Sequence, residues 1–232
     1  MQTNSYNPNG RREIKQAISK QQYHLLKSRL FTIMHLDENA SANGRYHIRS
    51  AYFDNLANKV LNEKKEGYLN RDKYRVRIYN YSDRVIHLER KSKRNNLTYK
   101  SKCSITREEY EKMQAGHIDW MESDQRALIR DLHLEMKLHL LKPVCVVDYE
   151  REAYIFPYGN VRITFDSKVQ TSIHNTNMFN KHLPMADVLE PNMLILEVKY
   201  DEYLPDMIRM LLQSVDTHAE AYSKYQLSRM YD

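Results

Sequence analysis

The stretch KYRVRIY, residues 73–79, alternates cationic and apolar side chains. A period of two is typical of a β-strand, because successive side chains of a strand point to opposite faces of the sheet. One face of this strand carries Lys73, Arg75 and Arg77, while the other carries a tyrosine, a valine and an isoleucine. The stretch therefore predicts a sheet with one apolar face and one strongly cationic face.

Four other predicted strands repeat this pattern. Their polar faces carry Glu89 and Lys91, Lys100 and Lys102, Arg162 with Thr164 and Asp166, and Glu197 and Lys199. A sheet with one solvated face explains any single strand of this kind. A solvated face does not readily explain the whole set, because like charges directly opposite each other on neighbouring strands destabilise a sheet. We expect an anionic ligand against this face, inside a tunnel if the sheet closes into a barrel with its apolar face outward.

Hairpin-like turns join several of these strands, so we expect mostly antiparallel pairing. Capping boxes at Ser19 and Thr106 predict two helix starts. The predicted strands cover residues 11–18, 45–54, 73–80, 85–93, 97–105, 144–155, 161–169 and 193–201, and further helices cover 56–66, 123–141, 204–215 and 216–230. The prediction is an α+β fold, with an eight-stranded, mostly antiparallel β-barrel flanked by helices. Residues 1–10 are expected to be a flexible N-terminus, and residues 11–232 to form one domain.

The charge of the chain is concentrated in one segment. The 232 residues carry a formal net charge of +6, but residues 71–102 alone contain eleven lysines and arginines against three acidic residues. Such a concentration indicates an anionic partner. The classes left open are a nucleic acid, a phosphorylated small molecule or polymer, and an acidic membrane surface.

Composition excludes several other classes of protein. Five glycines and six prolines are too few for a collagen-like or linker-rich chain. No run of eighteen apolar residues and no apolar N-terminal region is present, so we expect a cytoplasmic protein without a membrane span. Cys103 and Cys145 lie singly in apolar segments and are expected to be reduced, although a disulfide stays possible. Phosphate-loop, dinucleotide and zinc-ligand motifs are absent from the sequence.

An ordered set of short motifs resembles a known family. The set comprises Arg75-x-Arg77, Glu89-x-Lys91, Lys102, Arg151, Arg162, the segment ILEVK at 195–199, and Ser223-Lys224-Tyr225. Each piece alone is common, but their order over residues 11–230 is similar to the polyphosphate polymerase domain of the vacuolar transporter chaperone (VTC) family. That family is a branch of the triphosphate tunnel metalloenzymes.

The resemblance implies a tunnel that binds a triphosphate or polyphosphate chain together with a divalent metal, Mn²⁺ or Mg²⁺. The implied phosphate ligands are Lys15, Arg75, Arg77, Lys91, Lys102, Arg151, Arg162, Lys199, Ser223 and Lys224. The implied catalytic residues are Arg75, Arg77, Lys91 and Glu197, with Glu197 as the metal carboxylate. The wider superfamily begins with Glu-x-Glu-x-Lys, whereas this chain has Arg11, Glu13 and Lys15. The missing first glutamate favours the VTC branch.

The chemistry of these residues agrees with phosphoryl transfer. Arginine and lysine neutralise phosphate oxygens, and a hard cation accepts one carboxylate plus phosphate oxygens as ligands. We expect polyphosphate synthesis from a nucleoside triphosphate, or triphosphate hydrolysis if water is the acceptor. The alternatives are a module that only binds polyphosphate or nucleic acid, and a sensor of polyphosphate or inositol phosphates. Glu197 among the cations favours an enzyme without a nucleic-acid partner, and the family implies a separate membrane-protein partner.

Overall fold

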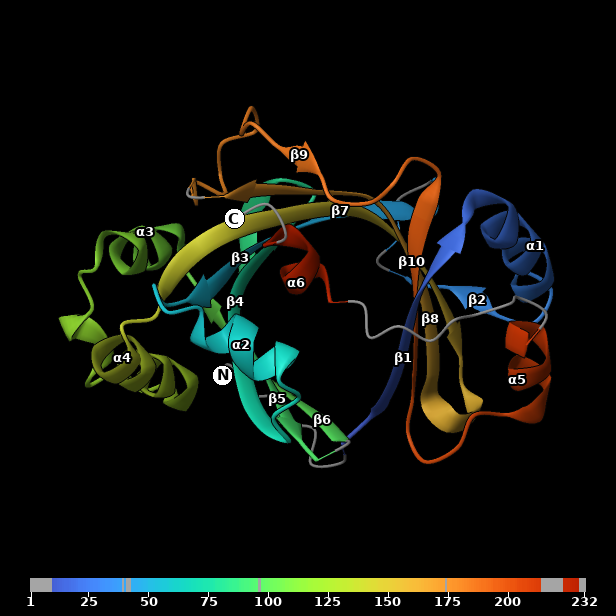
Figure 1. Cartoon of the computed structure of the whole chain (residues 1–232), viewed down its shortest axis with the longest axis horizontal. Helices are drawn as coiled ribbons and strands as arrows, with labels where there is room; N and C mark the ends of the chain where they lie inside the picture. Colours follow the sequence, from blue (N-terminus) through green and yellow to red (C-terminus); the bar gives the residue numbers. More distant parts are fainter. Residues whose placement is uncertain are drawn as a thin grey trace.

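The protein is an antiparallel sheet that curls around a central space, with helices on its outer side (Figure 1). The computed structural model describes residues 10–38, 40, 43–95, 97–173, 175–213 and 223–229. Eight strands follow one another across the sheet in the order β1 (Arg12–Ser19), β10 (Met193–Tyr200), β8 (Val161–Ile173), β7 (Lys142–Phe156), β3 (Arg45–Asp54), β4 (Asn70–Tyr79), β5 (Ser82–Arg94) and β6 (Leu97–Ile105). The eight-stranded antiparallel arrangement is confirmed.

Two features of the sheet differ from the prediction. The two-residue strands β2 (His35–Leu36) and β9 (Ala186–Asp187) were not expected, because they are too short to show a periodic pattern. The sheet also does not close into a continuous barrel. Its edge strands β1 and β6 meet at a single bridge, where the amide of Arg11 donates to the carbonyl of Thr98 over 3.1 Å. The tunnel is therefore a strongly curved sheet joined at one point.

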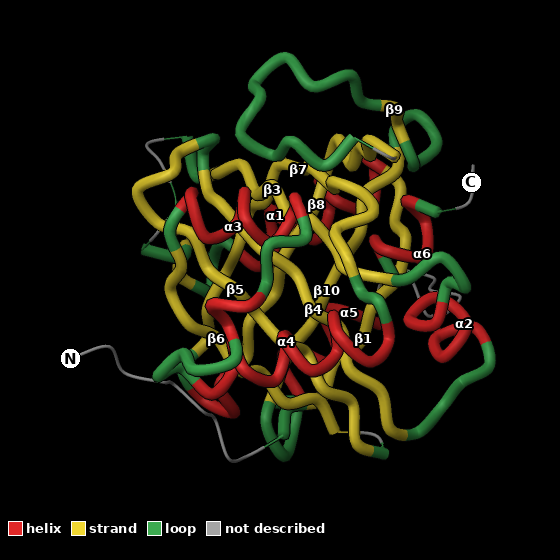
Figure 2. The backbone as a smooth tube through the Cα atoms, turned by 90° about the vertical axis from the view of Figure 1, so that its left-hand side faces the viewer, coloured by secondary structure: helices red, strands yellow, loops and turns green. Residues whose placement is uncertain are grey.

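In the described ranges of the chain, six α-helices lie around the sheet. They are α1 (Lys20–Leu30), α2 (Lys59–Lys65), α3 (Arg107–Ala115), α4 (Ala127–His139), α5 (Asp206–Gln213) and α6 (Lys224–Ser228). Figure 2 shows α3 and α4 lying across the sheet on one side, and Figure 1 places α1 and α5 at the opposite end. Within the described residues, no helix is long and apolar enough to span a membrane.

Local sequence explains how α1 and α3 begin. The hydroxyl of Ser19 accepts from the amide of Gln22 at 3.2 Å, and the Gln22 side chain accepts from the Ser19 amide at 2.8 Å. Thr106 and Glu109 form the same reciprocal pair at the start of α3. Both predicted capping boxes are confirmed. The helix predicted over 216–230 falls largely on residues outside the described part of the chain, as does the predicted flexible N-terminus.

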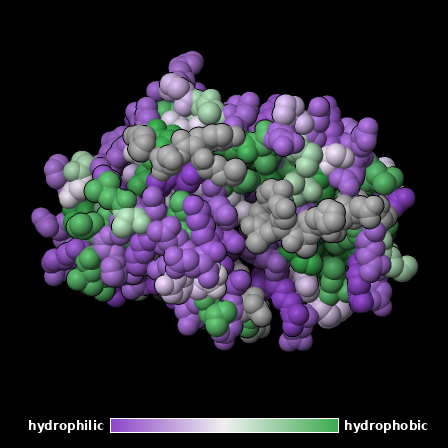
Figure 3. Space-filling view, viewed as in Figure 1, coloured by the Kyte–Doolittle hydropathy of each residue, from purple (hydrophilic) through white to green (hydrophobic). Residues whose placement is uncertain are grey.

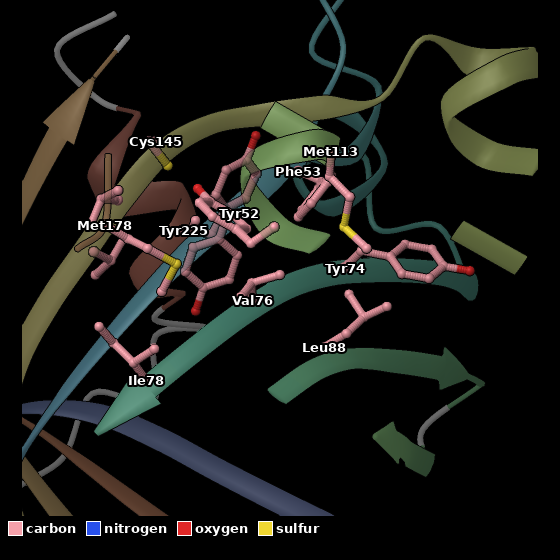
Figure 4. Close-up of a cluster of buried hydrophobic side chains, with 14 of the residues drawn as sticks. Tyr52, Phe53, Tyr74, Val76, Ile78, Leu88, Met113, Cys145, Met178 and Tyr225 are labelled. Atoms are coloured by element: carbon pink, nitrogen blue, oxygen red, sulfur yellow. The ribbon is translucent and has the colours of Figure 1, made fainter. Parts of the chain in front are cut away.

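The apolar face of the sheet is buried under the helices, as predicted. Tyr74, Val76 and Ile78 on β4 are at most 3% exposed. Figure 4 shows these three side chains on the same side of β4 in one buried cluster that also contains Met113 of α3. A second cluster lies under α1 and α5. Because the helices cover the convex side, the cationic faces of the strands line the concave side.

Both cysteines are buried and reduced, which confirms the prediction. Cys145 lies beneath α6, with its sulfur 3.5 Å from the hydroxyl of Ser228. Burial raises the pKa of the Cys103 thiol to about 11, so this side chain is uncharged at neutral pH. The cysteines act as packing residues of the core.

Asp54 joins three elements at the end of β3. This fully buried carboxylate accepts from the amides of Val60 at 2.9 Å and Leu61 at 3.1 Å, at the start of α2. It also accepts a short hydrogen bond from the hydroxyl of Tyr225 in α6. Asp54 therefore caps α2, whose own N-cap residue, Asn58, makes no side-chain cap. The same carboxylate holds α6 against the sheet.

We expect Tyr225→Phe to lower the free energy of unfolding by about 1.5 kcal/mol, because Asp54 loses a donor while its amide partners remain. Urea denaturation followed by circular dichroism measures this change. Tyr158→Phe is the matched control, since Tyr158 is 70% exposed. Equal stability of the two variants would show that the Asp54–Tyr225 bond does not anchor α6.

Candidate functional site: a cationic cavity inside the sheet

A cavity of about 880 Å³ occupies the concave side of the sheet. All eight long strands contribute to its wall, together with α2 and the segment 223–225. Its wall contains sixteen lysines and arginines but only three glutamates. The eleven residues implied by the family resemblance, Lys15, Arg75, Arg77, Lys91, Lys102, Arg151, Arg162, Glu197, Lys199, Ser223 and Lys224, all line it. Lys15 and Lys224, which are 209 positions apart in the sequence, are thus brought around one space by the curvature of the sheet.

Helix α2 contributes Lys64 to the cavity wall. In the space-filling view, the region around α2 is mostly hydrophilic, and apolar residues gather toward the two ends of the molecule (Figure 3). The surface over α2 therefore presents mainly polar side chains to solvent.

Arg75 and Arg77 share a buried carboxylate. Glu89, only 1% exposed, accepts from Nε of Arg75 at 2.8 Å and lies 3.8 Å from Nη1 of Arg77. Lys100 contacts its other oxygen at 2.5 Å. Burial opposes ionisation of Glu89, but these three cations outweigh it and hold the pKa of Glu89 well below its usual range. The carboxylate fixes both arginines, and further guanidinium N–H groups donate to hydroxyl groups, from Arg75 to Tyr52 and from Arg77 to Ser50 and Tyr149, each at 3.1 Å.

Arg151 and Lys224 share a second buried carboxylate. Arg151 donates from Nε and Nη2 to the two oxygens of Asp166 at 2.7 and 2.8 Å. Lys224 forms a short ion pair with the same group, which is fully buried. Because Lys224 belongs to α6, this ion pair adds to the Asp54–Tyr225 bond in tying α6 to the cavity wall.

Glu197 on β10 lies among three cations, which belong to β1, β7 and β10. Its Oε1 is 3.0 Å from Lys15 and 3.3 Å from Lys199, and its Oε2 accepts from Arg151 at 3.3 Å. Burial opposes ionisation of Glu197, but the charges of these three residues hold its pKa well below its usual range. Glu197 is therefore an ionised carboxylate in the middle of the cationic wall.

Glu13 completes the group of carboxylates. Its Oε2 is 2.5 Å from Nζ of Lys91 and 3.3 Å from Nζ of Lys15. Glu13 is the middle residue of the Arg11-x-Glu13-x-Lys15 motif, which spans the start of β1. It links the start of β1 to β5 across the gap where the sheet edges meet only once.

The remaining predicted ligands vary in their partners. Arg162 forms a short ion pair with Asp37 and donates to the hydroxyl of Tyr46 at 2.8 Å, so it is held at the cavity wall. Lys102 has no ion-pair partner among the described residues. The hydroxyl of Ser223 accepts from Lys73 at 3.4 Å. Their roles toward phosphate stay predictions.

Three lysines in the wall have pKa values that are lowered toward neutral pH. Burial, followed by the charges of Lys91 and Lys15, lowers the pKa of Lys73 to about 7. Burial and Lys15 lower the pKa of Lys91 to about 7, despite its contact with Glu13. Burial lowers the pKa of Lys100 to about 8. Burial is the largest cause of all three shifts, and neighbouring cations add to it.

The structure corrects the picture of a wall made almost wholly of free cations. No role for Glu13, Glu89 or Asp166 was predicted from the sequence, although each lies on a cationic face and pairs with cations of the wall. Lys73 and Lys100, which also line the cavity, were not predicted as ligands. The alternation that selected Arg75, Arg77 and Lys102 could have identified both lysines, because they lie two residues away on the same faces.

The donor set fits a divalent cation at one position. Among the described residues, no group of three histidine, cysteine, aspartate or glutamate side chains could hold a metal by itself. Glu197 is ionised and faces the cavity, and Mg²⁺ or Mn²⁺ commonly binds through one or two carboxylates together with substrate phosphate oxygens. Glu197 can therefore contribute to a metal site that is completed by a phosphate ligand.

The arrangement as a whole suits a chain of phosphate groups. Cations approach from several strands, arginines offer paired donors, and Glu197 provides an anionic oxygen among them. The geometry needs no protein nucleophile, because positioning and charge neutralisation are the main requirements of phosphoryl transfer.

Two solved structures share this fold. The Hippeastrum protein HpAC1, described with a dominant triphosphatase activity, has a TM-score of 0.56 at 13% identity over 94% of each chain. A candidate adenylate cyclase from Bacillus halodurans has a TM-score of 0.53 at 13% identity, covering 96% of this chain and 100% of that one. No curated protein sequence matches the chain.

The family comparison is more specific. The VTC domain matches residues 10–231, which include every strand of the sheet and all the cavity residues named above. The order of motifs noted in the sequence and the curved antiparallel sheet agree with that match. The chain is a member of the VTC domain family and has the fold of the triphosphate tunnel proteins.

Proposed function

We propose that the protein transfers phosphoryl groups in a metal-dependent reaction, making polyphosphate from a nucleoside triphosphate. The observation that carries this proposal is an ionised carboxylate, Glu197, held among Lys15, Lys199 and Arg151 in a cavity lined by many further cations. Glu197 is a charge partner of these cations and also an anionic oxygen ligand that a divalent metal can use, which the cations cannot supply. Membership of the VTC domain family supports the assignment.

Each part of the wall has a distinct role in this proposal. Arg75 and Arg77, fixed by Glu89, neutralise oxygens of the transferred phosphoryl group. Lys91 compensates charge on the neighbouring phosphate, and Arg151 positions the chain from β7. A divalent cation bound with Glu197 would polarise the transferred group. Because the side chains are held by buried ion pairs, little reorganisation is required when charge develops.

Hydrolysis of triphosphate is the second candidate function. It uses the same cavity with water as the acceptor, and the structurally similar HpAC1 is described with a dominant triphosphatase activity. The two reactions differ only in what occupies the acceptor position. A module that binds polyphosphate without turnover is the third outcome of the experiment that separates them.

That experiment is incubation of the full chain with ATP and Mn²⁺, followed by polyacrylamide gel analysis of polymer and a colorimetric assay of free phosphate. Polymer formation supports the proposed synthesis, whereas free phosphate without polymer identifies a triphosphatase. The absence of both products, with intact binding of tripolyphosphate, would overturn the proposal in favour of a binding module.

Tripolyphosphate is expected to stabilise the fold. A ligand at about one hundred times its dissociation constant contributes about 2.7 kcal/mol, which corresponds to a rise of about 5–10 °C in Tm for a chain of this length. Differential scanning fluorimetry measures the shift. Sulfate at the same ionic strength is the control, and equal shifts with both anions would contradict a specific site.

The shift should be larger at pH 7 than at pH 9. Lys73 and Lys91 have a folded-state pKa of about 7, below the ordinary value of 10.5. Above pH 7 the unfolded chain therefore binds more protons than the folded one, so the unliganded protein gains stability as pH rises toward 10.5. The same loss of protons removes positive charge that binds phosphate. A ligand-induced shift that grows with pH would contradict this assignment.

Arg75→Ala should weaken tripolyphosphate binding by about tenfold or more, because a charge-assisted hydrogen bond is lost. The fold should survive at lower stability, since Glu89 retains Lys100 at 2.5 Å and Arg77 at 3.8 Å. Isothermal titration calorimetry and thermal melting measure the two effects. Arg84→Ala removes an exposed arginine of the same strand pair and is the matched control. Unchanged affinity in Arg75→Ala would place this arginine in a purely structural ion pair.

Glu197→Gln should abolish metal-dependent turnover while tripolyphosphate still binds, because the cations remain and only the anionic oxygen is lost. It should also lower stability by about 3 kcal/mol, since Lys15 and Lys199 lose a buried partner. Turnover against Mn²⁺ concentration and melting of both proteins measure these effects, with Glu122→Gln on the surface as control. A variant that keeps wild-type turnover at every metal concentration would exclude Glu197 as the metal carboxylate.

A further inference from the structure

Helix α4 carries apolar side chains on two opposite sides. One side packs in the core through Leu128, Ile129, Leu132 and Met136. The other side carries Leu134 and Leu138, which are one turn apart and more than half exposed. A surface helix of a globular protein ordinarily has polar residues on the side opposite the core. The outer side of α4 is therefore apolar where solvent contact predicts polar residues.

Two further leucines lie at the C-terminal end of this helix. Leu140 directly follows α4, and Leu56 belongs to the loop between β3 and α2. The side-chain amide of Asn55 donates to the carbonyl of His139 at 3.0 Å, which holds that loop beside the end of α4. We call Leu56, Leu134, Leu138 and Leu140 the leucine patch; they are 54–87% exposed. Hydrophobic residues are visible at the end of the molecule where α4 lies (Figures 1 and 3).

The backbone of Leu140 adds a second sign that the patch is not incidental. Leu140 caps α4 in the left-handed conformation, with φ 55° and ψ 35°. Glycine or asparagine usually occupies this position, because the Cβ of other residues crowds the backbone there. The side chain does not offset this cost by burial, since it is 72% exposed. A leucine is thus placed at an unfavourable position where the described chain does not cover it.

Positive charge borders the leucine patch. Lys137 precedes Leu138 in α4 and Lys142 follows the helix; both are exposed, and neither forms an ion pair with the residues that the structure describes. The acidic residues of α4 differ, because Asp131 and Glu135 pair with cations of β5 and α2 at 2.7 and 3.8 Å. The exposed apolar surface is therefore flanked by lysines whose charge is not compensated.

This combination of charge and shape favours one kind of partner. A second copy of the chain would bring the same lysines against each other across a two-fold axis. An amphipathic helix of another protein is usually bound in a groove, whereas these leucines lie on the outer side of a helix. A bilayer with acidic phospholipids accepts apolar side chains at the boundary of its headgroups and attracts lysines by its phosphates. An acidic membrane surface is also one of the anionic partners that the basic charge of the chain indicates.

We propose that the leucine patch docks the protein on the surface of a bilayer that contains acidic phospholipids. The leucines enter the boundary between headgroups and acyl chains, while Lys137 and Lys142 contact the lipid phosphates. The docking does not rest on the proposed function, because none of the four leucines lines the cavity.

The test is co-sedimentation of the full chain with vesicles of phosphatidylcholine and phosphatidylglycerol, or of phosphatidylcholine alone. The main variant is the double substitution Leu138→Gln and Leu140→Asn, which changes two exposed side chains and keeps every cation. Met210→Gln is the matched control, since it changes an exposed apolar residue of α5 at the opposite end of the molecule. Leu134→Gln provides a second variant if the double variant does not fold.

We expect wild type to bind the mixed vesicles more tightly than phosphatidylcholine alone. The double variant should bind the mixed vesicles about one hundredfold more weakly, or about tenfold for each leucine. Lys137→Gln should weaken this binding about fivefold, and Met210→Gln should match wild type. Leu140→Asn alone should lower vesicle binding without lowering Tm, because asparagine tolerates the left-handed conformation.

Three outcomes would overturn the docking surface. Wild type that does not bind the mixed vesicles excludes it directly. Equal binding by wild type and the double variant would leave only charge attraction, because both proteins carry the same cations. Sedimentation velocity without lipid provides the third outcome: a wild-type dimer that becomes a monomer in the double variant would assign the patch to a second copy. Turnover of ATP and binding of tripolyphosphate are measured separately, so their failure does not affect this comparison.

Discussion

Buried carboxylates make the cationic wall possible. Glu89, Asp166 and Glu197 are each at most 4% exposed, and each accepts from or pairs with at least two cations. Without them the arginines and lysines of facing strands would repel one another in a region of low dielectric. Removing either partner of such a buried pair is strongly destabilising. Six of the ten assigned phosphate ligands pair with these three groups, namely Lys15, Arg75, Arg77, Arg151, Lys199 and Lys224.

Only some cations of the cavity wall have a carboxylate partner. Arg75, Arg77 and Arg151 are fixed by close carboxylates, which pre-orders them for a transferred phosphoryl group. Lys73 and Lys102 have no such partner within the described residues. The paired part of the wall is suited to positioning and the unpaired part to holding additional negative charge. The cations of such a cavity repel one another when it is empty, and binding of a polyanion reduces this repulsion.

The short C-terminal helix couples the cavity to the core. On its apolar side Tyr225 donates to Asp54 at the end of β3, and on its polar side Lys224 pairs with Asp166 of β8. Ser223, at the start of α6, reaches Lys73. One helix of five residues thus brings two predicted phosphate ligands to the wall and is held there by two separate strands. A change that displaces α6 from the sheet would therefore also displace Ser223 and Lys224 from the cavity wall.

Strand periodicity determined the fold class and much of the site. The alternation in residues 73–79 separated cationic from apolar side chains, and the order of motifs identified the family before any contact was known. Alternation reports only which face a side chain occupies, so it could not show that Glu89 would hold Arg75 and Arg77 or that Asp166 would hold Arg151. Those pairs depend on the register between strands and on the curvature that brings β1 near β6. Tertiary structure alone decided which cations are compensated, because compensation depends on distances across the sheet.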